Sequence, residues 1–251
     1  MSGHSKWANI KHKKASVDAK RGAAFTKVVK LISAAVRQGG NGDPDMNAAL
    51  RLAVEKAGAV NMPKDNIDRA IKKALGDGNG IQYEALTYEG YAAGGVAILV
   101  EALTDNRNRT TPEVRKIFEK NGGNMGEMGC VAWMFKRAGM IQFDAGDRDE
   151  ENLMELAMDL GANDVELSDD GMAIFKTEVD QFAHVIDGLK KQGFEPKGDL
   201  VSLPETPMPI DNVEMAEKIL KLMEFIEDHD DVQSVTSNME MSDEVRAALE
   251  A

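Results

Sequence analysis

The feature that most constrains the fold is a change of hydrophobic spacing at residues 76–80, a glycine-rich stretch with the sequence GDGNG. Before this stretch, apolar residues recur every three or four positions, which is the period of an amphipathic α-helix. After it, apolar residues come in short runs bounded by turn residues, which is typical of β-strands. Because glycine clusters between two such patterns mark loops, residues 76–80 are predicted to be a linker.

Three helices are predicted before the linker. The first covers residues 22–38, where the apolar side chains follow the spacing of one helix face. Asp43 is expected to cap the second helix, with Pro44 in its first position. The third helix is expected to start near Pro63 and to end at Gly76. The N-terminal part of the chain is therefore predicted to be a small helical domain.

The segment after the linker is predicted to contain strands at residues 83–88, 96–103 and 131–135. A helix is expected between the second and the third of these strands. Thr110 or Thr111 can cap it, because a proline and a glutamate follow in the pattern of a capping box.

The C-terminal half adds a self-contained pattern and a tail. Residues 139–203 follow the order strand, helix, two strands, helix and strand, which is ferredoxin-like. The tail, residues 204–251, has one long helix and too few strands for a sheet of its own. We therefore expect it to join the segment before residue 139. The predicted class is α+β: a helical N-terminal domain (1–80), a discontinuous middle domain (81–138 and 204–251) and an inserted domain (139–203), with both α+β domains ferredoxin-like.

Charge is distributed unevenly along the chain. The net charge of the 251 residues is −13, yet residues 1–40 contain nine basic residues and one acidic residue. Residues 138–251 contain eight basic and 29 acidic residues. Such asymmetry indicates a polyanion-binding segment on an acidic body. The acidic half is interpreted as a solubilising surface, whereas the basic segment is interpreted as an interface because its charges follow a helical order.

The candidate interface has three parts, and two of them have an alternative interpretation. Trp7 lies among lysines and can stack on a base, or it can dock the basic segment onto the helical domain. Arg107 and Arg109 precede a predicted helix N-terminus, where backbone N–H groups favour anions, or they belong to a capped surface loop. The third part is the basic side of the first helix. The candidate nucleic-acid-binding residues are Lys6, Trp7, Lys11, Lys13, Lys14, Lys20, Arg21, Lys27, Lys30, Arg37, Arg107 and Arg109.

The sequence offers no constellation typical of an enzyme. His184 lies among apolar residues of a predicted helix and is interpreted as structural. His229 lies in the acidic run at residues 227–231, which is interpreted as a solvated helix end. Cys130, the one cysteine of the chain, cannot form an internal disulfide and is interpreted as a buried, inert thiol. We therefore expect no catalytic residue, no metal site and no cofactor.

The chain shows no sign of a membrane segment. No apolar run approaches the ~20 residues that a membrane-spanning helix needs, and the first residues lack the apolar core of a signal peptide. We expect a cytoplasmic protein without a membrane partner or a small-molecule substrate. The sequence leaves the oligomeric state open.

Several long motifs resemble those of one known family. The opening, residues 1–14 (MSGHSKWANIKHKK), is similar to the signature opening of the YebC/PmpR family. Further similar blocks follow in the family's order along the chain: residues 18–22 (DAKRG), 61–67 (NMPKDNI), 88–91 (YEGY), 104–110 (TDNRNRT) and 129–135 (GCVAWMF).

The resemblance implies a helical N-terminal domain followed by two α+β domains, without enzyme activity or a cofactor. It implies nucleic acid as the partner of the basic N-terminal surface. Some members are described as transcriptional regulators that bind double-stranded DNA at promoters. Others resemble translation factors: the mitochondrial relatives activate synthesis of a cytochrome c oxidase subunit, and bacterial relatives act on ribosomes stalled at sequences such as proline runs. The first hypothesis is therefore a regulator that binds double-stranded DNA, and the second is a ribosome-associated factor that binds ribosomal RNA. An enzyme ranks far below both.

Overall fold

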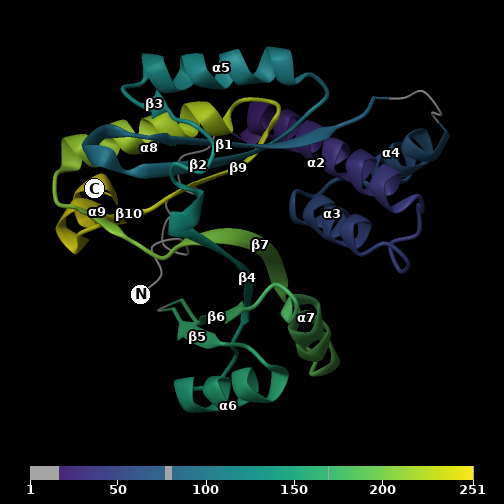
Figure 1. The fold of residues 1–251 in the computed structure, drawn as a ribbon. Helices are drawn as coiled ribbons and strands as arrows, with labels where there is room; N and C mark the ends of the chain where they lie inside the picture. Colours follow the sequence, from purple (N-terminus) through teal and green to yellow (C-terminus); the bar gives the residue numbers. More distant parts are fainter. Residues whose placement is uncertain (1–16, 77–80, 169, 251) are drawn as a thin grey trace. The chain divides into compact units, whose positions relative to one another are not determined.

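The computed structural model describes residues 17–76, 81–168 and 170–250, and Figure 1 shows how their elements are arranged. Contacts divide the chain into two compact units. The first unit contains residues 1–134 and 204–251, and the second contains residues 135–203. The sheets, helices and side-chain clusters of each unit are described separately below.

Three helices form an apolar cluster in the first unit. They are α2 (Val17–Gly39), α3 (Ala48–Ala59) and α4 (Lys64–Gly76). Ile32 of α2 and Leu50 of α3 are fully buried in this cluster. Alanines supply most of the other buried positions on α3 and α4. Small side chains allow close approach of the helices, so this cluster is compact although it contains few large residues.

The second helix begins later than the sequence predicted. Asp43 and Pro44 lie in a turn, and α3 is capped by Asn47, whose Oδ1 accepts a hydrogen bond from the backbone N–H of Leu50 at 3.1 Å. Asn47 is buried, and its Nδ2 donates to the carbonyl oxygen of Ala35 at 2.9 Å. This amide therefore fixes the start of α3 against α2, a role that the exposed Asp43 cannot fill.

The second apolar cluster of this unit lies against a four-stranded antiparallel sheet with the order β3-β1-β2-β9. Its strands are β1 (Glu84–Tyr91), β2 (Ala97–Thr104), β3 (Asn124–Met125) and β9 (Val232–Ser237), and the 3-10 turn η1 (Ala93–Gly95) joins the first two. Helices α5 (Arg107–Lys120) and α8 (Val213–Glu227) pack on one face. Ile98 and Val100 of β2 meet Phe118 of α5 and Ile219 of α8 there, all fully buried. The pairing of β9 with β2 brings the C-terminal tail to the sheet.

The tail also contributes short elements. The two-stranded parallel sheet β8–β10 joins β8 (Met208–Ile210) to β10 (Met239–Met241), and α9 (Asp243–Glu250) follows. Along the chain, the first sheet is built from the hairpin β1–β2, then α5 and β3, then α8 and β9. A ferredoxin-like fold begins with a strand and a helix, so this sheet differs from it by opening with a hairpin.

The helix after β2 also starts earlier than predicted. Asn106 caps α5 by accepting a hydrogen bond from the backbone N–H of Arg109 at 3.2 Å, so neither Thr110 nor Thr111 is the cap. Both threonines lie inside the helix, where the hydroxyl of Thr110 turns toward a buried carboxylate described below. Arg109 consequently belongs to the first turn of α5.

The strand predicted at residues 131–135 is wrong. Residues Ala132–Met134 form the 3-10 turn η2, and the strand begins only at Phe135. The buried carboxylate of Glu89 explains the difference, because it takes the backbone N–H groups that a strand would offer to a neighbour. These donors, at 2.6–2.7 Å, are the N–H groups of Gly129, Val131 and Ala132.

The second unit has the ferredoxin-like sheet order β5-β6-β4-β7. Its elements are β4 (Phe135–Asp144), α6 (Glu150–Leu160), β5 (Asp164–Leu167), β6 (Met172–Thr177), α7 (Phe182–Lys191) and β7 (Lys197–Pro204). Phe143 and Phe175 are buried and meet edge-to-face, with ring centroids 4.9 Å apart. Gly161 ends α6 with φ 81°, a left-handed conformation that suits glycine.

The predicted α+β class is confirmed. The predicted boundaries of three domains stay a prediction, because the contacts separate only residues 135–203 from the rest. Across the described residues, no helix combines the length and the apolar character that crossing a membrane requires.

The cap of α3 can be tested by two matched substitutions. Asn47→Ala should lower the free energy of unfolding by about 1–3 kcal/mol, because it removes a buried cap and the hydrogen bonds of the buried Asn47 amide to the Ala35 and Asn41 carbonyls. Asp43→Ala should lower it by less, about 0.5–1 kcal/mol, since the exposed carboxylate of Asp43 only accepts the backbone N–H of Asp45 at 3.0 Å. Urea unfolding followed by circular dichroism measures both. An equal loss in the two variants would contradict the assignment of the cap.

Candidate nucleic-acid interface

The structure describes only part of the predicted interface. Five of the candidate residues lie outside the described residues: Lys6, Trp7, Lys11, Lys13 and Lys14. Lys20 and Arg21 belong to α2, but their side chains are outside the described part. Five candidates have described side chains: Lys27, Lys30, Arg37, Arg107 and Arg109.

Two of these five cations meet at one buried carboxylate, that of Asp231. Lys30 Nζ lies 2.5 Å from Asp231 Oδ1, and an Arg109 guanidinium nitrogen lies 2.8 Å from Oδ2. The hydroxyls of Thr104 and Thr110 lie 3.1 and 2.6 Å from the same Oδ2. The side chain of Asp231 is only 2% exposed. We call these five residues the Asp231 cluster.

The cluster strongly favours the ionised carboxylate. Burial alone raises the pKa of Asp231, but the hydrogen bonds from Lys30, Thr110 and Arg109 and the charge of Lys30 outweigh it. The pKa of Asp231 therefore lies well below its ordinary value. The pKa of Arg109 is raised by its hydrogen bonds to Asp231 and Asp105. Both partners are thus fully charged at neutral pH.

The basic side of α2 faces the turn that follows α8. Lys27 Nζ donates a hydrogen bond to the carbonyl oxygen of Glu227, and Lys30 Nζ donates to that of Asp230 at 2.9 Å. These lysines do lie opposite the apolar face of α2, as the spacing predicts. They contact an acidic turn of the same unit there, and Lys30 keeps only 13% of its side chain exposed.

The interpretation of residues 227–231 as a solvated helix end is wrong for Asp231. Four of the five residues in this run are acidic, a composition that is typical of a solvent-exposed helix end. The sequence pattern therefore does not show that one of the four is buried. Only the last acid turns inward, where β9 begins. His229 is also engaged: its Nδ1 accepts the backbone N–H of Asp231 at 3.1 Å, and its Nε2 lies 3.0 Å from Glu113.

Arg107 and Arg37 are placed differently. Arg107 lies at the first position of α5 with its side chain 60% exposed, 3.6 Å from the exposed carboxylate of Glu84. Such exposed pairs contribute little to stability, so the guanidinium of Arg107 is available to an anion. Arg37 is half-buried in the last turn of α2. The structure therefore joins Lys30 and Arg109 in one cluster but leaves Arg107 outside it.

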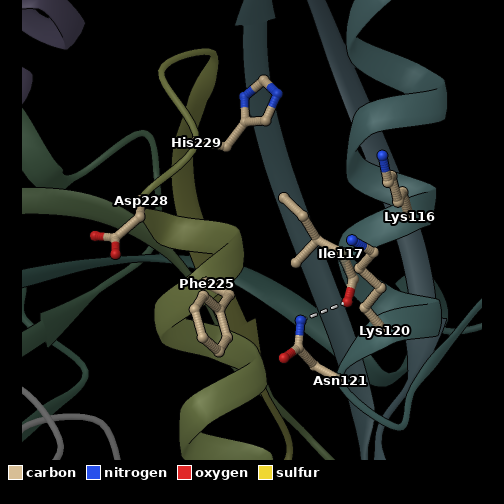
Figure 2. A pocket seen from close by; sticks show the side chains of 7 residues that line it. All are labelled: Lys116, Ile117, Lys120, Asn121, Phe225, Asp228 and His229. Atoms are coloured by element: carbon tan, nitrogen blue, oxygen red, sulfur yellow. Dashed lines mark hydrogen bonds between the residues drawn. The ribbon is translucent and has the colours of Figure 1, made fainter.

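A groove that the sequence analysis did not identify runs between α5 and α8. It encloses about 470 Å³, and its lining residues are Lys116, Ile117, Lys120, Asn121, Phe225, Asp228 and His229. Figure 2 shows Phe225 of α8 opposite Lys120 and Asn121 of α5, whereas the carboxylate of Asp228 points away from α5. Phe225 is 44% exposed, although the apolar spacing of α8 gave no reason to single it out.

Cys130 does not have the setting of a nucleophile. Burial raises the pKa of its thiol, and the nearby negative charge of Glu89 raises it further. A raised pKa lowers the thiolate fraction at neutral pH, and the thiolate is the reactive form. Within the described part of the chain, no group of three or more His, Cys, Asp or Glu residues is arranged to hold a metal ion.

The comparisons with known proteins agree with this fold. Residues 5–77 match the family described as "TACO1/YebC protein N-terminal domain", and residues 83–239 match "TACO1/YebC second and third domain". The chain therefore belongs to the TACO1/YebC family, for which YebC/PmpR is the name used above.

Relatives resemble the chain over nearly its whole length. A protein of Syntrophomonas wolfei named "Probable transcriptional regulatory protein" is 50% identical, covering 99% of this chain and 100% of the relative. One of Treponema denticola with the same name is 52% identical, covering 96% and 97%. The crystal structure of a conserved hypothetical protein from Aquifex aeolicus has a TM-score of 0.83 and 44% identity, covering 94% and 97%.

The Asp231 cluster makes a clear prediction about stability. Asp231→Asn should lower the free energy of unfolding by about 3 kcal/mol, because it leaves the largely buried ammonium group of Lys30 without its counter-charge. Asp230→Asn is the matched control, since Asp230 is exposed and only its backbone carbonyl accepts from Lys30. Chemical unfolding at pH 7 measures both variants. A loss below 0.5 kcal/mol, as a rough limit for a surface change, would show that the cluster is not stabilising.

The lowered pKa of Asp231 also predicts a pH dependence. The folded pKa lies below the unfolded value of ~3.9, so the ion pairs contribute fully above about pH 5 and lose their contribution as the pH falls below it. Wild-type protein should therefore lose more stability between about pH 6 and pH 3 than Asp231→Asn does. Urea midpoints at both pH values measure the difference. Equal losses in the two proteins would contradict the lowered pKa.

Proposed function

We propose that the chain is a nucleic-acid-binding regulatory protein that binds double-stranded DNA and regulates transcription without enzymatic activity. The observation that carries the proposal is the charge of residues 1–40, nine basic residues against one acidic residue on a chain of net charge −13. A cationic segment of this kind neutralises phosphates, while the acidic remainder repels them and confines contact to one end. The names of the relatives from Syntrophomonas wolfei and Treponema denticola support a role in transcription.

The described contacts divide the candidate residues by role. Lys30 and Arg109 are held by Asp231, and Lys27 contacts the Glu227 carbonyl, so we assign these three mainly to holding α2 and α5 in place. The main phosphate contacts are then assigned to the residues before α2 and to its first turns. Arg107 is a separate, exposed contact.

The competing function is that of a ribosome-associated translation factor that binds ribosomal RNA and relieves stalled elongation. The same basic segment would serve it, because ribosomal RNA offers the same phosphates. The two functions differ in what the protein accompanies in the cell. Co-sedimentation with ribosomes that survives DNase treatment would favour translation, and preference for one duplex over scrambled duplexes would favour transcription.

Phosphate contacts by the basic segment predict steep salt dependence. If about six phosphates are neutralised, a log–log plot of duplex affinity against salt should have a slope of roughly −5. The triple variant Lys11→Glu, Lys13→Glu and Lys14→Glu should weaken binding to every duplex and flatten this slope. Fluorescence anisotropy with a labelled duplex measures both effects.

The matched control reverses three exposed lysines of the acidic half: Lys176, Lys191 and Lys197. It makes the same change in net charge but should keep the slope of the wild type and most of its affinity. Duplex binding that ignores both salt and the three N-terminal lysines would overturn the proposed role of the segment.

A further inference from the structure

The groove between α5 and α8 combines an exposed aromatic ring with cations. Phe225 exposes 44% of its surface, although it lies one residue from fully buried Ile226. Together with Ile117 it gives the groove an apolar lining. The ammonium group of Lys221 lies 5.9 Å from the centre of the Phe225 ring, within the range of a cation–π contact. The ring is therefore bordered by positive charge on its own helix.

The opposite wall adds two further positive charges. Lys116 and Lys120 are exposed and one turn apart on α5, so their Cβ atoms are separated by about 5–6 Å. Among the described residues, neither lysine takes part in an ion pair. Two acids also border the groove, but Glu113 is engaged with His229 and the carboxylate of Asp228 points away from α5. Exposed positive charge thus lines the wall opposite the aromatic ring.

We propose that this groove binds an unpaired base of single-stranded DNA, with the base stacked on Phe225 and the adjoining phosphates on Lys116 and Lys120. Single-strand binding sites combine these two elements, a cationic track for the backbone and an aromatic ring for the base. A duplex cannot use the ring, because its bases are already stacked on one another. The groove is therefore a second contact, separate from the basic N-terminal segment and different in the form of nucleic acid that it takes.

The lining favours DNA over RNA as the occupant. The ribose 2′-hydroxyl is the group by which a protein tells RNA from DNA, and reading it needs a free polar group beside the base. Of the polar groups in the lining, we assign the two lysines to phosphates, and the amide nitrogen of Asn121 is engaged with the carbonyl oxygen of Ile117 at 2.8 Å. The choice of nucleic acid over another anion rests on the proposed function, and the experiment separates the two claims.

The test compares binding of the full chain to labelled oligo(dT), oligo(U) and duplex DNA by fluorescence anisotropy, with strands of about 12 nucleotides. Phe225→Ala and Phe225→Leu should raise the dissociation constant for oligo(dT) about five- to hundredfold, whereas Phe225→Tyr, which keeps the ring, should bind like the wild type. Lys116→Glu with Lys120→Glu should weaken oligo(dT) binding and its salt dependence. Lys191→Glu with Lys197→Glu, two exposed lysines of the other unit, is the control with the same change in net charge.

The possible results separate the groove proposal from the proposed function. All Phe225 variants should keep their affinity for duplex DNA and stay folded under the binding conditions, as a urea titration checks; Phe225→Tyr should keep the urea midpoint as well, because it keeps the ring. Wild-type protein that does not bind oligo(dT), or Phe225→Ala that binds it as well as the wild type, overturns the groove proposal. Tighter binding of oligo(U) that depends on Phe225 overturns the assignment to DNA. Absence of duplex binding by the wild type instead overturns the proposed function and leaves the oligo(dT) comparison valid.

Discussion

The carboxylate of Asp231 joins parts of the chain that are far apart in sequence. Lys30 is 201 residues away and Arg109 is 122 residues away. A buried charge is costly unless it is paired and hydrogen-bonded, and here two cations and two hydroxyls surround it. The arrangement requires α2, the end of β2, the start of α5 and the start of β9 to be in place together. The helical region and the first sheet are therefore coupled through one side chain.

This coupling changes what the positive charges of the chain can do. Lysines and arginines count equally in a net charge, but Lys30 and Arg109 already have a buried carboxylate partner. Arg107 has only the exposed carboxylate of Glu84 beside it, and Lys116 and Lys120 are exposed. Ion pairs inside a protein compete with phosphate for the same cation. Cations without a buried carboxylate partner are consequently better candidates for contacts with nucleic-acid phosphates. Among the described residues, Arg107, Lys116 and Lys120 of α5 meet that criterion better than Lys27 and Lys30 in the middle of α2.

Local sequence patterns predicted most of the elements. The spacing of apolar residues located α4 and the ferredoxin-like order of residues 139–203, because these depend on interactions within a short stretch. Predictions failed where a distant polar group decides the outcome. Glu89 takes the N–H groups of Gly129, Val131 and Ala132, so no strand forms at residues 131–134, while Asn47 displaces Asp43 as a cap.

The candidate site was less predictable for the same reason. The charge pattern identified the basic segment, but no local signal distinguishes Asp231 from its acidic neighbours. Asp231 is buried because β9 pairs with β2, a strand that lies more than 120 residues earlier in the chain. The α5–α8 groove depends on two helices meeting, and the position of Phe225 at its edge follows from the way in which α8 packs rather than from its apolar spacing.

We propose that the chain contacts nucleic acid through its basic N-terminal segment, with duplex DNA as the target. Crosslinking in the cell, followed by identification of both the attached nucleic acid and the attached peptide, tests this proposal most directly. We expect DNA fragments concentrated at a few promoter regions and joined to peptides from residues 1–40. Crosslinks concentrated on ribosomal RNA would contradict the assignment to transcription, and crosslinks confined to the acidic half would contradict the assigned surface.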